Sequence, residues 1–224
     1  MSFTRSTATI LAKELRTEFR SRELLGTTVV FVLIVIMLFS FTFNPTSSES
    51  RRFGPGLLWI AFLFAGSLML QPSFLREQTN DTLSALRLAP IDPFSILAGK
   101  MAANFLFLLL VELILLPVFA VLYNIAILPV LAPLVLVLVL GTIGLATTGT
   151  VFSAVAAQAR LRELLLPLLL LPVLAPVLIA STEATAGILR DPSELSLVWL
   201  TFLTAFDVVF LTAAWLFGEY LLEE

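Results

Sequence analysis

Residues 24–43 read LLGTTVVFVLIVIMLFSFTF, a run of twenty residues without a charged side chain. Between Val29 and Phe41 the stretch is apolar around the whole circumference of a helix. About 20 helical residues suffice to cross the roughly 30 Å hydrocarbon layer of a bilayer. A membrane β-strand would instead alternate apolar and polar residues over about ten positions. The stretch therefore predicts a helix that spans a membrane.

The same pattern recurs along the chain. Of the 224 residues 59% are hydrophobic and 13% are charged, which is more apolar surface than a single soluble core could bury. We therefore expect an all-α integral membrane protein with a single transmembrane domain over residues 1–224. Its six spans are predicted at about 24–43, 54–75, 96–123, 131–157, 164–182 and 195–218.

The basic residues predict the orientation. They gather mainly at the N-terminus, after span 2 and after span 4. Because loops rich in Lys and Arg stay in the cytoplasm, these segments and both termini are expected inside. The chain would then be a multi-pass protein of the inner (plasma) membrane. The residues concerned are Arg5, Lys13, Arg16, Arg20, Arg22, Arg76, Arg87, Lys100, Arg160 and Arg162.

Residues 1–22 have the pattern of an amphipathic helix lying in the membrane interface. The alternative is an ordinary charged anchor ahead of span 1. The expected apolar face comprises Ala8, Leu11, Ala12, Leu15 and Phe19, and the expected polar face Lys13, Arg16 and Arg20.

Two segments on the predicted cytoplasmic side could contact a partner protein. After span 2, Thr79 or Asn80 can cap a short helix that Pro90 ends. A helix this short is marginal alone in water, so it would dock on a partner or rest on lipid headgroups. The second segment is the tight, mixed-charge link 158–163. The residues predicted to couple to a partner are Asp81, Leu83, Leu86, Arg87, Arg160, Arg162 and Glu163.

Two spans have distinctive compositions. Span 5 carries Pro167, Pro172 and Pro176, which are expected to kink it, either for packing or as a hinge. Span 4 is rich in Gly, Ala, Ser and Thr, small residues that let helices approach closely. It predicts a packing seam, within one chain or between two copies.

Two acids fall deep in the membrane, Glu112 in span 3 and Asp207 in span 6. An ionised group at the bilayer centre costs at least about 2.5–3.5 kcal/mol, so each acid must be protonated, paired or exposed to a polar cavity. Together with Asn104, the two acids either line a cavity or contact a partner. The alternative is that each acid is protonated and hydrogen-bonded inside the bundle.

The chain lacks the residues of most catalytic sites. It has no His and no Cys, and the lone pair Gly99-Lys100 is followed by Met101, so no phosphate-binding loop exists. Zinc sites, His or thiolate ligation of haem, and Ser-His catalysis are thereby excluded. We expect a non-catalytic subunit that binds no cofactor directly.

Three stretches resemble the CcmB family, the permease subunits of the cytochrome c maturation system. Residues 74–104, FLREQTNDTLSALRLAPIDPFSILAGKMAAN, are similar to that family's segment between spans 2 and 3. Residues 160–180, RLRELLLPLLLLPVLAPVLIA, resemble its proline-rich passage, and residues 13–23, KELRTEFRSRE, resemble its basic leader. The chain departs from the family at Thr82, where Gly is common.

The resemblance implies an ABC exporter complex. In it a CcmA-like ATPase binds ATP, a CcmC-like membrane protein and a CcmE-like chaperone handle haem, and this chain couples hydrolysis to haem export or to release of the loaded chaperone. Hydrolysis would move the helix around Asp81 to Arg87 and the link around Arg160 to Glu163. The sparse polar content of the spans favours the mechanical role. The alternatives are a general ABC-2 exporter of lipid, drug or glycan, and a membrane scaffold without an ATPase.

Overall fold

The computed structural model describes residues 2–42, 48–79, 91–157, 162–190 and 196–223, and within these ranges every regular element is helical. The elements are α1 (Phe3–Ser21), α2 (Glu23–Thr42), α3 (Ser48–Leu70), α4 (Pro72–Thr79), α6 (Pro93–Leu122), the 3₁₀ turn η1 (Leu128–Val130), α7 (Leu131–Ala157), α8 (Arg162–Arg190) and α9 (Leu197–Glu223).

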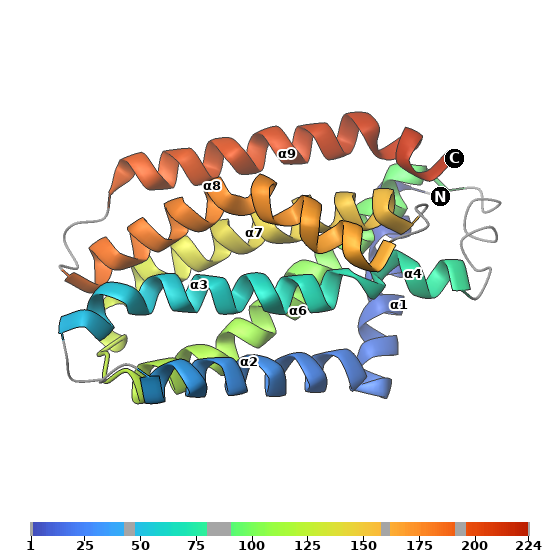
Figure 1. The fold of residues 1–224 in the computed structure, drawn as a ribbon. Helices are drawn as coiled ribbons and strands as arrows, with labels where there is room; N and C mark the ends of the chain where they lie inside the picture. The colour runs from blue at the N-terminus through green and yellow to red at the C-terminus, as the bar shows by residue number, and fades with distance from the viewer. Residues whose placement is uncertain (1, 43–47, 80–90, 158–161, 191–195, 224) are drawn as a thin grey trace.

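The described residues include six helical segments long and apolar enough to cross a membrane, which confirms the predicted number. They run alongside one another in one elongated bundle, and both termini lie at the same end of it (Figure 1). The fifth span continues past the predicted end at Thr182 to Arg190. The segments are Glu23–Thr42, Phe53–Phe74, Pro93–Leu122, Leu128–Ala157, Leu168–Arg190 and Leu197–Gly218.

Helix α7 forms the centre of the bundle, where it packs against α3, α4, α6, α8 and α9. Its glycines allow the closest approaches. A Cβ atom at Gly141 would overlap the ring of Trp59 in α3, and one at Gly149 would overlap the side chain of Leu70. The packing seam predicted for span 4 therefore lies between helices of one chain.

The outer faces of α2 and α9 carry large apolar side chains with no protein over them. Phe41 is 87% exposed, and Trp215 and Leu38 are each 62% exposed. Such surfaces are stable in contact with lipid tails, as expected for membrane spans.

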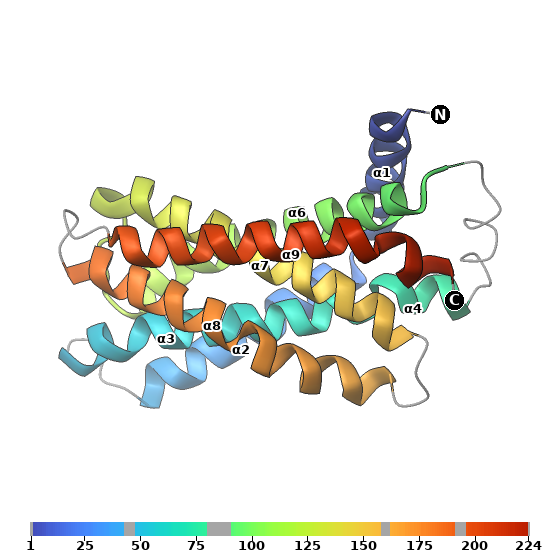
Figure 2. The same ribbon diagram turned by 90° about the horizontal axis from the view of Figure 1, so that it is seen from above.

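Helix α1 crosses the end of the bundle and does not run alongside the spans (Figure 2). The chain turns into α2 at Arg22, whose φ of 55° is left-handed, and the Glu18 carboxylate accepts a hydrogen bond from the Leu25 amide at 2.9 Å. The expected apolar face is only partly the face that packs. Leu11 and Leu15 contact the core, whereas Phe19 is 53% exposed.

The most buried residues of α1 are Ser6, Ile10 and Glu18. The burial of Ile10 has a local cause on α6. A Cβ atom at Gly99 would lie 2.7 Å from Ile10, so glycine at this position lets the two helices touch. Hydrophobic periodicity could not predict this face, because its polar members are buried by tertiary contacts.

Candidate functional site

The predicted coupling residues fall largely beyond what the structure describes. Asp81, Leu83, Leu86, Arg87 and Arg160 lie outside the described residues. Arg162 and Glu163 belong to the first turn of α8, and their side chains are likewise not described. The helices that flank residues 80–90 are α4 and α6, and α4 and the start of α6 lie at the bundle end that also holds the termini (Figure 1).

The start of α6 is fixed by its sequence. The Asp92 carboxylate accepts a hydrogen bond from the Phe94 amide at 2.9 Å, and Pro93 occupies the first turn, where its missing N–H costs nothing. On the other side of the 80–90 segment, the Ser153 hydroxyl of α7 donates to the Leu70 carbonyl at 2.8 Å, at the point where α3 gives way to α4. The chain is thus tied to α7 where α3 ends, and it is capped where α6 begins.

Helices α1, α4 and α6 meet at a group of four charged residues, Lys13, Glu14, Glu77 and Lys100, which we call the lysine–glutamate cluster. Lys100 is 1% exposed, and its Nζ lies 2.8 Å from Glu14 Oε1 and 3.2 Å from Glu77 Oε2. Lys13 pairs with Glu14 at 3.1 Å and also with Glu77. Two positive and two negative charges make the cluster neutral.

The side chain of Lys100 also bonds to the backbone of α4. Its ammonium donates to the Ser73 carbonyl at 2.5 Å and lies 4.8 Å from the centre of the Phe74 ring. A buried cation needs such a complete set of partners, because losing one partner of a buried pair costs about 3–5 kcal/mol. The contacts of Lys100 thus tie α6 to both α1 and α4.

The pKa values of the two α1 residues show that the attractions prevail. Burial alone would lower the pKa of Lys13, but its hydrogen bond to Glu77 and the charges of both glutamates raise it above its ordinary value of 10.5. Burial alone would raise the pKa of Glu14, but Lys100 and Lys13 together lower it below its ordinary 4.5. Both residues are therefore charged at neutral pH.

Asn104 continues the polar contacts into the bundle. Its amide donates to the Ser73 hydroxyl at 3.2 Å and to the Thr150 hydroxyl of α7 at 2.9 Å. A cavity of about 30 Å³, large enough for a water molecule, lies beside it and beside Glu14, Glu18 and Ser73. Asn104 therefore belongs with the lysine–glutamate cluster rather than with Glu112.

Glu112 is buried between α6 and α7. Its Oε1 lies 2.6 Å from the Thr142 hydroxyl, which is also 2.7 Å from the Leu138 carbonyl. A hydroxyl has one hydrogen, and a carbonyl can only accept. Both contacts are satisfied when Thr142 donates to Leu138 and a protonated Glu112 donates to Thr142. The geometry thus favours a neutral acid that joins two spans.

Asp207 is 5% exposed and lies against Gly144 of α7, where a Cβ atom would come within 3.0 Å of Oδ1. Within the described residues neither carboxylate oxygen has a hydrogen-bond partner. The nearby Thr204 hydroxyl donates to the Leu200 carbonyl of its own helix. The two intramembrane acids therefore have different surroundings.

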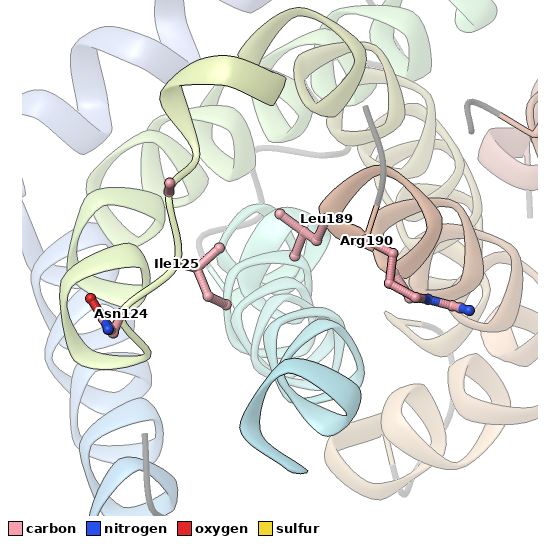
Figure 3. A pocket seen from close by; sticks show the side chains of 6 residues that line it. Asn124, Ile125, Leu189 and Arg190 are labelled. Atoms are coloured by element: carbon pink, nitrogen blue, oxygen red, sulfur yellow. The ribbon is translucent and has the colours of Figure 1, made fainter. Parts of the chain in front are cut away.

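A cavity of about 340 Å³ opens at the other end of the bundle, between residues 124–126 and the last turns of α8. Figure 3 shows the apolar side chains of Ile125 and Leu189 near its middle, while the polar ends of Asn124 and Arg190 point outward on opposite sides. No sequence pattern predicted this cavity, because it forms between a loop and a helix end that are distant in sequence.

Sequence reasoning also missed the lysine–glutamate cluster, although a signal was present. Lys100 falls inside the predicted span 96–123, where an unpaired ammonium would be as costly as the two acids. In the positive-inside pattern Lys100 marks only orientation. Its partners, Glu14 and Glu77, belong to segments whose packing on α6 no local pattern reveals.

Comparison with known proteins identifies the family of the chain. The model of the family described as CcmB protein matches residues 5–217. The heme exporter protein B of Pseudomonas aeruginosa is 35% identical over 197 residues, which cover 88% of either chain. Proteins of the same name from Paracoccus denitrificans and Rhodobacter capsulatus are 32% and 31% identical, and the matches cover 78% of this chain and 80% and 79% of theirs. The chain therefore belongs to the CcmB family.

Proposed function

We propose that this chain is the membrane-spanning subunit of a haem-export system for cytochrome c maturation. The observation that carries the proposal is the family match over residues 5–217, together with relatives named as heme exporters. The six apolar helices suit a permease subunit. The alternatives, a general exporter of lipid, drug or glycan and a scaffold without an ATPase, have no comparable support.

In this proposal a CcmA-like ATPase docks at the bundle end that carries the termini. Its contacts are Asp81, Leu83, Leu86 and Arg87 on one side, and Arg160, Arg162 and Glu163 on the other. Both segments adjoin helices that end or begin at that end of the bundle, which supports a common docking surface (Figure 1). ATP is bound and hydrolysed by the partner, so the chain itself is not an enzyme.

The same end faces the cytoplasm, the chain lies in the inner membrane, and α1 lies in the membrane interface. The basic residues of the N-terminus and of the segment after span 2 support this orientation. The course of α1 across the bundle end supports its interfacial position (Figure 2).

The chain works mechanically in this proposal. A CcmC-like membrane protein and a CcmE-like chaperone handle haem, and movement of the spans releases the haem-loaded chaperone. Pro167, Pro172 and Pro176 lie in the continuous helix α8 and would serve as its hinge. The absence of His and Cys from the sequence fits a subunit that leaves haem ligation to others.

The proposal is tested by purifying the tagged chain from membranes and identifying what comes with it. We expect an ATPase and a haem-handling membrane protein. Changing Leu83 and Leu86 together to Asp should remove the ATPase while the chain stays in the membrane. The matched control is Leu38→Asp with Leu211→Asp, two exposed positions on membrane spans, and any effect of that pair would be on insertion instead. Purification without any ATPase would contradict the proposal.

A further inference from the structure

Three helices that are distant in sequence are joined at Lys100. Helix α1 contributes Lys13 and Glu14, α4 contributes Ser73, Phe74 and Glu77, and α6 contributes Lys100 itself. Glu77 lies near the C-terminal end of α4, only two residues before its last residue, Thr79. The cluster therefore binds α4 close to its C-terminal end, next to the point where the 80–90 segment begins.

Apolar contacts hold α4 chiefly against α7, and they reach α6 at Phe74. Phe74 is 1% exposed and packs in a small cluster with Ile96 and Leu97 of α6. Apolar packing is non-directional and tolerates small shifts of one helix against another. The ion pairs of Lys100 are directional, and a shift of α4 along α6 would leave buried charges unpaired.

A shift of α4 along α6 would also disturb helix α1. It touches α6 at Gly99, the residue next to Lys100, where a Cβ atom would lie 2.7 Å from Ile10 and 3.0 Å from the Thr7 carbonyl. Glu14 bonds to Lys13 and Lys100, and both lysines also bond to Glu77. Every pair in the cluster except Lys13–Glu14 joins two helices.

We propose that Lys100 is a positioning residue that makes α1, α4 and the start of α6 one rigid body, so that displacement of the 80–90 segment is transmitted to α1 and the spans. The rigid body is a property of this chain alone. Its use in transmission rests on the proposed function, because the partner ATPase supplies the displacement.

The first test needs no partner and measures hydrogen exchange of the full chain in lipid nanodiscs. The variant is Lys100→Met with Glu14→Gln and Glu77→Gln, which removes the three buried charges and leaves only Lys13, whose side chain is 42% exposed and reaches water. We expect exchange in peptides covering Phe3–Ser21 and Pro72–Thr79 to quicken by roughly fivefold or more, a typical lower limit of coupling between sites. Exchange in α7 should stay unchanged, showing that the variant folds.

The matched control is Arg16→Met, which removes an exposed positive charge from the same helix α1. It should leave exchange in both helices as in the parent chain. If the triple variant exchanges like the parent, or if only one of α1 and α4 quickens, the rigid body does not exist and the proposal is wrong.

The second test uses the complete membrane complex and measures ATP hydrolysis and the yield of mature cytochrome c side by side. In the triple variant we expect hydrolysis to persist while the yield per ATP falls by roughly fivefold or more. The single variant Lys100→Arg keeps the positive charge and both glutamates. Its yield of mature cytochrome c per ATP should lie above that of the triple variant. Equal losses of hydrolysis, yield and protein would reveal a merely structural cluster and overturn the proposal.

The two tests separate this inference from the proposed function. Normal cytochrome c in cells that lack the chain would refute the proposed function and, with it, the transmission. The exchange measurement would still decide whether Lys100 joins the three helices.

Discussion

The sequence position of Lys100 and its burial lead to two different predictions. As a basic residue close to a span end it marks orientation, and as a buried cation it requires anions from elsewhere in the fold. The structure supplies them from Glu14 and Glu77. Residue chemistry alone could predict that Lys100 needs partners, but only tertiary packing could identify them.

The pH dependence of the cluster follows from its pKa values. The pKa of Glu14 is lowered in the folded chain, so its contribution to stability is present above pH 4.5 and is lost as pH falls through the lower folded value. The pKa of Lys13 is raised, so its contribution is complete below pH 10.5 and is lost as pH rises through the higher folded value. We expect hydrogen exchange of α1, corrected for its intrinsic pH dependence, to show constant protection between these limits. A transition near pH 7 would contradict the ion pairs.

Glu112 allows a prediction that separates its two interpretations. If the acid is neutral and donates to Thr142, Glu112→Gln keeps a donor and should cost less than about 1 kcal/mol of unfolding free energy. Glu112→Ala removes the donor and creates a cavity, and should cost about 2–5 kcal/mol. Thermal unfolding in detergent would measure both. A large loss in the Gln variant would show that the ionised form is required.

Asp207 should respond differently, because no described group stabilises its charge. We expect Asp207→Asn to leave insertion intact and to lower cytochrome c maturation, since an unpartnered buried carboxyl is retained for a role beyond packing. Maturation is measured as haem-stained cytochrome c against the amount of chain in the membrane. Normal maturation would leave packing against Gly144 as the only role of Asp207.

At the scale of elements, the spans were predictable because membrane helices are defined by length and hydrophobicity alone. The extension of α8 to Arg190 was not, because Glu183 interrupts the apolar pattern while the helix continues. The face of α1 was also missed in part. Ser6 and Glu18 are buried there, and hydrophobic periodicity assigns polar residues to the outside.

The seam between α3 and α7 gives a prediction about glycine. Gly141→Ala should cost about 1–3 kcal/mol of stability, because its methyl group would overlap the Trp59 ring. The matched control is Gly26→Ala in α2, where no atom lies within 4 Å of the added carbon. That variant should be neutral or gain up to about 1 kcal/mol from helix propensity. Equal effects of the two changes in thermal unfolding would argue against the seam.

At the scale of the whole molecule, the chain combines an apolar bundle with one end where its polar contacts concentrate. That end holds both termini, the crossing helix α1, helix α4 and the start of α6 (Figures 1 and 2). The spans form a bundle whose apolar outer faces suit lipid. The lysine–glutamate cluster links the end of α4 rigidly to that bundle. This division suits a subunit that receives a displacement from a partner.

The central claim is that the chain couples a partner's ATP hydrolysis to cytochrome c maturation. The most direct measurement is the amount of haem-containing cytochrome c in cells whose own copy of this gene is deleted. We expect the amount of haem-containing cytochrome c to fall to background in these cells. It should return with the intact chain, but not with the variant carrying both Leu83→Asp and Leu86→Asp. Normal cytochrome c in the deleted cells, or full recovery with that variant, would contradict it.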